Sequence, residues 1–359
     1  MRLVKPPLQF SIRPVPPFRL DLTVWALRRR ARNLVDRWDG MTYRRVVVIN
    51  GHAAQLSVRQ AGSSTVPLLV VTITPRPRPD VDKARLRRLL DRLLGLRIDM
   101  TRWYQTAARD ARLRPLADKF RGMKPPRFPT VFEALINAFA CQQLSLEAGL
   151  TLLNRLAATC GPAFDAQGDG PYAFPAPCDV ARLSPERFRT IGFSRQKVGA
   201  LLDLAHAITQ RDLDLESLAR GEDEVIEQKL RELRGVGRWT AEYVLLRGFG
   251  RLHVFPGDDV GAQKRLARWL GHSHPLDYAG VGRAVARWQP YAGLVYFHLL
   301  LEGLSQSGAL ESVSRTGLEG LATEVTRATL GSRTGSYVRH ADRDSARLGP
   351  EHLSRRRGP

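Results

Sequence analysis

The apolar residues along the chain change their spacing once, near residue 115. Before that point they alternate or run together in Val-rich stretches, which is typical of β-strands. The stretches are Arg44–Asn50, Ala53–Arg59 and Leu68–Thr74. Asn50-Gly51 predicts a tight hairpin, because both residues tolerate positive φ. A Leu-rich face over Val81–Leu94 predicts a helix that covers the sheet.

Beyond Pro115 the apolar residues recur with the helical period as far as Leu304. Pro residues mark the ends of these segments, and we expect about ten helices. The clearest are Pro129–Ala140, Leu146–Thr159, Pro185–Ile191, Lys197–Gln210, Glu222–Leu233, Trp239–Gly248, Asp259–Leu270, Tyr278–Arg287 and Tyr291–Leu304.

These patterns predict an α+β protein with four parts. We expect an extended N-terminus over residues 1–17, a β-rich domain over 18–114, a helical domain over 115–304 and a disordered tail over 305–359. The last part is rich in Ser, Gly, Thr and Arg.

Composition adds a strong positive charge to this picture. The 359 residues carry a formal net charge of +21. The expected tail holds nine Arg and six acidic residues (9 − 6 = +3), so +18 remains on residues 1–304. Such a surplus indicates a polyanionic partner, either nucleic acid or an anionic membrane. A hydrophobic fraction of 43% excludes a wholly disordered basic protein.

The cysteines and the apolar stretches exclude several other classes. Cys141, Cys160 and Cys178 cannot form a disulfide framework, and their spacing does not suit a zinc or iron–sulfur site. No stretch has the apolar length of a membrane span, and the N-terminus lacks a secretory apolar region. We therefore expect a soluble cytoplasmic protein that is not secreted.

One short segment carries a recognisable functional pattern. Leu233-Arg234-Gly235-Val236-Gly237-Arg238-Trp239-Thr240-Ala241 joins two predicted helices through two glycines. Glycines allow a tight turn, and the free N–H groups at the start of the second helix suit a phosphate. The segment alone is equally consistent with a plain corner between two helices.

A second segment follows about 20 residues later and reads Phe255-Pro256-Gly257-Asp258-Asp259. Together the two segments resemble the helix-hairpin-helix-GPD superfamily of DNA glycosylases, and within it the DNA-3-methyladenine glycosylase II type. The likeness covers roughly residues 120–304. It includes Arg127-Phe128-Pro129, Gln142-Gln143-Leu144-Ser145, Phe174-Pro175-Ala176-Pro177, Ile191-Gly192-Phe193-Ser194 and Arg287-Trp288-Gln289-Pro290-Tyr291. The β-rich region is similar to the small TATA-binding-protein-like domain of this type.

The resemblance implies an enzyme of base excision repair. Such an enzyme flips an alkylated purine, of the 3-methyladenine or 7-methylguanine type, out of double-stranded DNA and hydrolyses its N-glycosidic bond. It implies binding from the minor-groove side, a monomer and association with the nucleoid. It makes a membrane partner unnecessary.

Asp259 is the catalytic carboxylate by this resemblance. Bond cleavage builds positive charge on the sugar, and a fixed anion near C1′ stabilises that charge. A helix start also favours an ionised aspartate. The alternative for either Asp258 or Asp259 is a helix N-cap, and we assign the structural role to Asp258.

Trp239 occupies the place where bifunctional relatives such as endonuclease III have a nucleophilic Lys. An indole cannot form a Schiff base, so we expect a monofunctional enzyme that leaves an abasic site. Trp239 and Tyr243 lie four residues apart and predict one aromatic wall of a base pocket, although Tyr243 is equally consistent with a core residue. Val260 and Leu300 stand where the resemblance leads us to expect further aromatic residues.

The remaining site residues come from the resemblance as well. Gln143, with Leu144 beside it, would fill the gap left by a flipped base, although Gln142 and Gln143 also suit a simple bridge between helices. The residues expected to contact the DNA backbone are Arg234, Gly235, Val236, Gly237, Arg238 and Thr240. No cofactor is required, but the resemblance implies a monovalent or divalent cation held by the carbonyls of Leu233 and Val236.

Two other functions fit the same residues. One is a glycosylase for oxidised, deaminated or mismatched bases. The other is a module that binds DNA lesions without turnover, against which the presence of Asp259 argues.

Overall fold

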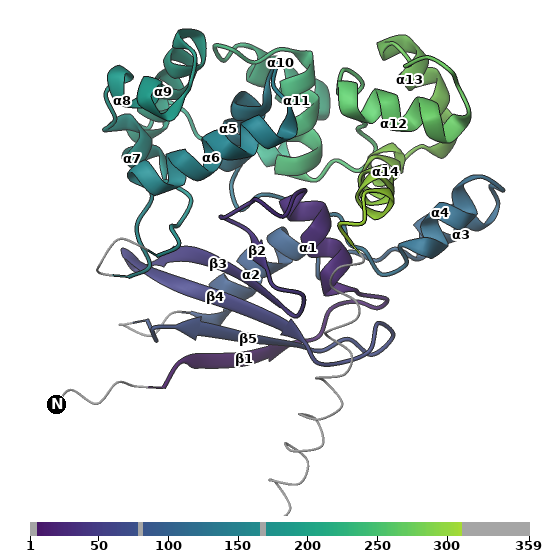
Figure 1. The fold of residues 1–359 in the computed structure, drawn as a ribbon, viewed down its shortest axis with the longest axis horizontal. Helices are drawn as coiled ribbons and strands as arrows, with labels where there is room; N and C mark the ends of the chain where they lie inside the picture. The colour runs from purple at the N-terminus through teal and green to yellow at the C-terminus, as the bar shows by residue number, and fades with distance from the viewer. Residues whose placement is uncertain (1–5, 78–81, 166–169, 311–359) are drawn as a thin grey trace, which may run out of the picture. The chain divides into compact units, whose positions relative to one another are not determined.

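Five antiparallel strands form one sheet in the order β1-β5-β4-β3-β2 (Figure 1). The computed structural model describes residues 6–77, 82–165 and 170–310. The strands are β1 (Leu8–Ile12), β2 (Arg37–Trp38), β3 (Thr42–Ile49), β4 (His52–Gln60) and β5 (Leu69–Thr74).

The predicted hairpin joins β3 to β4. Ile49 pairs with His52, which leaves a two-residue loop. Asn50 has φ 52° and Gly51 has φ 79°, so both loop residues are left-handed as a type I′ turn requires. The alternating residues of the strands then place one apolar face against helices α1 and α2, with Leu56 and Val71 fully buried.

The helices follow the predicted segments closely. Before residue 120 they are α1 (Leu20–Arg28), α2 (Lys83–Leu94), α3 (Thr101–Ala108) and α4 (Leu113–Lys119). After it they are α5 (Val131–Cys141), α6 (Leu146–Cys160), α7 (Pro177–Ala181), α8 (Pro185–Ile191), α9 (Arg195–Thr209), η1 (Ser217–Arg220), α10 (Asp223–Arg231), α11 (Arg238–Val244), the π-helical turn η2 (Leu245–Phe249), α12 (Val260–Leu270), α13 (Tyr278–Val285), η3 (Ala286–Trp288) and α14 (Ala292–Gln306). The α+β class is confirmed.

Two apolar clusters hold the helices together. One contains α5 to α11, and the other contains α12 to α14 together with α1, α3 and α4. Trp103 of α3 lies against Tyr291 and His298, with ring centroids 5.9 and 5.0 Å apart. The boundary expected between residues 114 and 115 is therefore not a break in the packing, because α1, α3 and α4 share a core with α14.

The structure describes most of the N-terminal segment but little of the C-terminal tail. Part of the segment expected to be merely extended forms β1, which pairs with β5 over Leu8–Ile12. The tail expected over 305–359 lies almost entirely outside the described residues, which end six residues into it (310 − 305 + 1 = 6), just past the end of α14. Among the described helices, none has the length and apolar character needed to span a bilayer.

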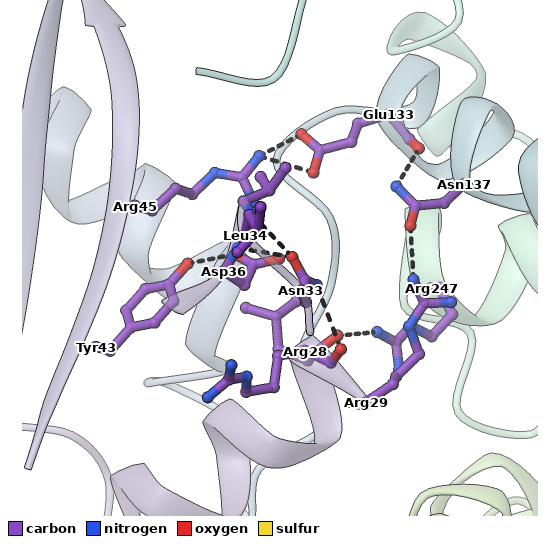
Figure 2. A network of polar contacts seen from close by, with 12 residues as sticks. Arg28, Arg29, Asn33, Leu34, Asp36, Tyr43, Arg45, Glu133, Asn137 and Arg247 are labelled. Atoms are coloured by element: carbon purple, nitrogen blue, oxygen red, sulfur yellow. Dashed lines mark hydrogen bonds and ion pairs between the residues drawn. The ribbon is translucent and has the colours of Figure 1, made fainter. Parts of the chain in front are cut away.

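A buried guanidinium joins the sheet to the first helix of the helical part (Figure 2). Arg45 of β3 pairs with Asp36 at 2.8 Å and with Glu133 of α5 at 2.6 Å. The hydroxyl of Tyr43 donates to Asp36 at 2.7 Å. All three charged side chains are at most 5% exposed. Charges this deep require partners, so the sheet and α5 can pack only in this register.

We expect Glu133→Ala to destabilise the fold by about 3 kcal/mol, because it removes one of two carboxylates from a buried charge. Urea denaturation measures the change. Glu227→Ala is the control, since its pair with Arg231 lies at the surface, 33% and 53% exposed, and should contribute little. Equal effects of the two substitutions would contradict the importance of the buried pair.

His298 lies in the second cluster with no exposed surface. Nδ1 lies 2.7 Å from the carbonyl oxygen of Leu294, and Nε2 has no hydrogen-bond partner among the described residues. Burial lowers the pKa of His298 to about 4. The folded protein therefore holds a neutral imidazole at neutral pH.

Below pH 6.5 the unfolded chain takes up a proton at His298 that the folded chain does not take up until about pH 4. We therefore expect the free energy of unfolding to fall by roughly 3 kcal/mol from pH 6.5 to pH 4. In His298→Phe the free energy of unfolding, measured by urea denaturation, should change less between pH 6.5 and pH 4. Asp110 provides an internal reference. Burial raises its pKa, but hydrogen bonds from Trp288 and Arg287 outweigh burial and lower the pKa to about 2. Its contribution to the free energy of unfolding is therefore lost only below pH 3.8.

Candidate active site

A cavity of about 1030 Å³ contains the predicted site. Its walls come from both helical clusters, namely the end of α1, the α5–α6 loop, the start of α9, the turn before α11, the start of α12 and α14. The predicted residues that line it are Gln143, Leu144, Gly235, Gly237, Arg238, Trp239, Thr240, Tyr243, Asp258 and Asp259. The tertiary structure therefore gathers residues from Arg29 to Leu300, far apart along the chain, around one cavity.

Asp259 uses both carboxylate oxygens. It is the N-cap of α12, where Oδ1 accepts the amide of Ala262 at 2.7 Å. Oδ2 accepts the hydroxyl of Tyr296 at 3.0 Å. Asp258 was assigned the structural role, but the N-cap is Asp259, because the chain enters the helix one residue later; Asp258 instead pairs with Arg238. Asp259 is therefore a structural cap that also lines the cavity, and each of its oxygens has capacity for a further hydrogen bond.

Tyr296 is a site residue that the sequence analysis missed. It lies in the long apolar helix α14, is 5% exposed and lines the cavity. Burial raises its pKa well above the usual value, so the phenol remains a hydrogen-bond donor. The available signal was a hydroxyl group within an apolar helix, since a buried Tyr usually has a polar partner.

Asp258 pairs with the first residue of α11. Arg238 Nε lies 2.7 Å from Asp258 Oδ2, and its guanidinium carbon lies 3.7 Å from the centroid of the Tyr278 ring. Arg238 was expected to contact a DNA backbone, and this stays a prediction, since its guanidinium is paired within the chain but its side chain is 45% exposed.

Glu242 fixes the loop that precedes α12 through two hydrogen bonds. Oε2 accepts the amide of Gly257 at 2.9 Å, and Oε1 accepts the hydroxyl of Tyr278 at 2.8 Å. Burial raises the pKa of Glu242 and also raises the pKa of Tyr278 to about 12. A Cβ on Gly257 would lie 2.6 Å from the Tyr278 ring, so only glycine fits there. This packing places Asp259 two residues further on.

Trp239 and Tyr243 form the expected aromatic wall. Their ring centroids are 5.5 Å apart and the planes are inclined by 31°. Tyr243 belongs to the core and also lines the cavity, so both interpretations of it hold. Leu300 and Val260 also line the cavity, Leu300 buried and Val260 59% exposed. The cavity is therefore less aromatic than the resemblance alone would imply.

Of the two glycines in the turn before α11, the fold requires Gly235 but not Gly237. Gly235 has φ 81°, and a Cβ there would lie 3.0 Å from Ala200. A Cβ on Gly237 would meet nothing within 4 Å, so the fold itself does not require that glycine. The open space suits close approach of a partner to the backbone.

Two of the expected contact residues have side chains turned inward. Val236 is 7% exposed and packs in the core. Thr240 is 1% exposed, and its hydroxyl accepts from Gln142 at 2.8 Å. Their side chains therefore pack inside the protein, and the contact of these two residues with DNA stays a prediction that would involve their backbone groups.

The α5–α6 loop divides two roles among neighbouring residues. Gln142 forms the bridge, since Nε2 also donates to the carbonyl oxygen of Gly235 at 2.8 Å. Gln143 has a left-handed backbone with φ 54° and an exposed side chain. Leu144 is 46% exposed. The side chains of Gln143 and Leu144 are thus exposed to solvent beside the cavity.

The other predicted positions at the hairpin lie at the surface. Arg234 Nη1 pairs with Asp203 at 3.0 Å and its side chain is 59% exposed. The carbonyl oxygen of Leu233 accepts the amide of Val236 at 3.1 Å. The cation expected at these two carbonyls stays a prediction.

Arg29 is a second residue that the sequence analysis missed. It lies at the end of α1, is 5% exposed and reaches the cavity. Nothing in the run Arg28-Arg29-Arg30 separates it from an ordinary solvated basic surface.

Comparisons with known proteins agree with this geometry. The family model described as HhH-GPD superfamily base excision DNA repair protein matches residues 136–290. A putative DNA-3-methyladenine glycosylase of Bacillus subtilis is 31% identical over 173 residues, which are 47% of this chain and 58% of that protein. DNA-3-methyladenine glycosylase 2 of Escherichia coli is 28% identical over 180 residues, which are 50% of this chain and 60% of that protein. The chain thus spans less than two thirds of these curated relatives.

The fold is also found among solved structures. The 3-methyladenine DNA-glycosylase from Archaeoglobus fulgidus superposes with a TM-score of 0.71 at 24% identity, covering 81% of this chain and 97% of that one. This likeness extends the agreement to the sheet, which lies before the region that the family model matches.

Proposed function

We propose that this chain is a member of the HhH-GPD superfamily of base excision DNA repair proteins, whose family model matches residues 136–290, and that it is a monofunctional DNA glycosylase for alkylated purines. The observation that carries the proposal is the position of Asp259. Its carboxylate lies in a cavity large enough for a purine, together with the indole of Trp239.

The proposed reaction follows from these groups. A flipped purine stacks on Trp239, since alkylated purines are electron-poor. The bond from C1′ to the purine nitrogen breaks, and its electron pair leaves with the base. The Asp259 carboxylate stabilises the positive charge on the sugar. Water then adds to C1′ and gives its proton to Asp259, which leaves an abasic site.

The surrounding residues are arranged to hold double-stranded DNA. Gln143 and Leu144 are the exposed side chains beside the opening, and we propose that one of them fills the space of the flipped base from the minor groove. The open backbone at Gly237 and the start of α11 would receive a phosphate. Binding as a monomer in the cytoplasm, at the nucleoid, completes the proposal.

We expect Asp259→Asn to lower the release of 3-methyladenine and 7-methylguanine from methylated DNA by at least about 100-fold, because the charge is lost. Asparagine caps helices as well as aspartate does, so α12 should remain folded and DNA binding should persist. Chromatography of the released bases and a binding assay measure the two effects. Asp258→Asn is the matched control and should cost at most about tenfold.

A rate for Asp259→Asn within about threefold of the wild type would contradict the assignment of the catalytic carboxylate. Failure of the wild-type chain to release any damaged base would contradict the proposed enzyme itself.

We also expect no covalent adduct when the chain is treated with borohydride during reaction with damaged DNA. A Schiff base needs a free amine at C1′, and Trp239 cannot provide one. Lys197 is the amine that lines the cavity, but its Nζ donates to the carbonyl oxygen of Gln142 at 2.8 Å. An adduct that disappears in Lys197→Gln would show a bifunctional enzyme and identify its nucleophile.

A further inference from the structure

The end of α1 brings a buried guanidinium to the wall of the cavity (Figure 2). Arg29 is the C-cap of α1 and has φ 64°. This left-handed backbone is uncommon for residues other than Gly, Asn and Asp. Sparsely populated backbone conformations of this kind are often found at functional sites. The conformation directs a long basic side chain into the protein rather than into solvent.

The partners of Arg29 are all neutral. Nη2 donates to Oδ1 of Asn137 at 2.7 Å, and Nη1 donates to the hydroxyl of Tyr243 at 2.9 Å. Burial raises the pKa of Tyr243, so its hydroxyl remains uncharged. Nε has no hydrogen-bond partner, and no carboxylate forms an ion pair with Arg29, among the residues that the structure describes. The positive charge of Arg29 is thus held without a carboxylate in direct contact, although Asp36 contributes a favourable charge from further away.

A second buried guanidinium lies behind the first. Arg247 has no exposed surface and donates to the carbonyl oxygens of Ala26 and Leu27 at 2.9 and 3.1 Å. Both guanidinium groups face the ring of Phe128, at 5.7 and 5.0 Å from its centroid. Two buried positive charges with neutral partners make this wall of the cavity strongly electropositive.

The charge has opposite consequences for two kinds of damaged purine. A purine methylated at N7 or N3 carries a fixed positive charge in DNA, and a buried guanidinium repels it. A deaminated purine such as hypoxanthine is neutral and presents carbonyl and ring-nitrogen acceptors. Hydrogen bonds from a charged donor to such acceptors are stronger than those from a neutral donor.

We propose that Arg29 is a specificity-determining residue that favours neutral, acceptor-bearing damaged purines over purines with a fixed positive charge. The proposal rests on the glycosylase function proposed above and concerns only the order of its substrates: alkylated purines are still released, and neutral acceptor-bearing purines rank above them. Asp259 lines the same cavity and, in the proposed reaction, acts on the sugar of every substrate, so Arg29 changes the ranking of bases without changing the reaction.

The test compares two duplexes of one sequence that contain either hypoxanthine or 7-methylguanine. Single-turnover rates of base release give the ratio of the hypoxanthine rate to the 7-methylguanine rate. The two bonds differ in intrinsic lability, but this difference is the same for every variant and cancels when the ratios are compared. In Arg29→Gln we expect the ratio to fall by about tenfold or more.

Two further variants separate charge from packing. Arg29→Lys keeps the positive charge and should retain a ratio within about threefold of the wild type. Arg30→Gln is the matched control, because Arg30 also lines the cavity but pairs with Glu147 at 3.0 Å and is 35% exposed. Its ratio should equal that of the wild type. An unchanged ratio in a folded Arg29→Gln would overturn the proposal.

Binding by the wild-type chain tests the same inference without any substitution in Arg29. Duplexes with a 2′-fluoro sugar at the damaged base resist cleavage and can carry either hypoxanthine or 7-methylguanine. We expect tighter binding of the hypoxanthine duplex, and equal or weaker binding would overturn the proposal. Failure of the wild-type chain to release either base would instead contradict the proposed enzyme, which keeps the two failures distinguishable.

Discussion

The ion pairs of Arg45 with Asp36 and Glu133 connect the sheet to the rest of the fold. Removing either side of this buried pair would leave a charge without its counter-charge, so strand β3 and helix α5 meet in one register. Helix α5 then carries Asn137, whose side-chain amide donates to the carbonyl oxygen of Glu133 and whose Oδ1 accepts from Arg29 (Figure 2). One continuous line of polar contacts therefore runs from the sheet to the wall of the cavity, and the N-terminal region is part of the site.

The second constraint is that Asp259 performs two tasks at once. Its Oδ1 begins helix α12, and its Oδ2 receives the hydroxyl of Tyr296 from α14. Glu242 fixes the preceding loop through the amide of Gly257. Because each contact comes from a different element, the carboxylate has little freedom to rotate. Such preorganisation is what an anion needs in order to stabilise a charge that exists only in the transition state.

Charge is distributed unevenly around this anion. Arg238 and Arg30 are paired with carboxylates, whereas Arg29 and Arg247 have neutral partners inside the protein. The excess positive charge of the sequence is thus partly an internal property of the site and not only a surface that attracts a polyanion. This division explains why net charge alone indicates the class of partner but says nothing about which base the cavity accepts.

The sequence by itself determined the local elements, because strand alternation, the Asn50-Gly51 turn and the helical periods depend on neighbouring residues. It also indicated Asp259 and Trp239, since their motifs are contiguous. Only the tertiary structure decided that Thr240 turns inward, that Asp259 rather than Asp258 caps α12, and that α3 packs with α14. It alone brought Arg29 and Tyr296 to the cavity. These outcomes depend on contacts between residues far apart in the chain, and no local pattern encodes which distant side chain becomes the partner of a buried polar group.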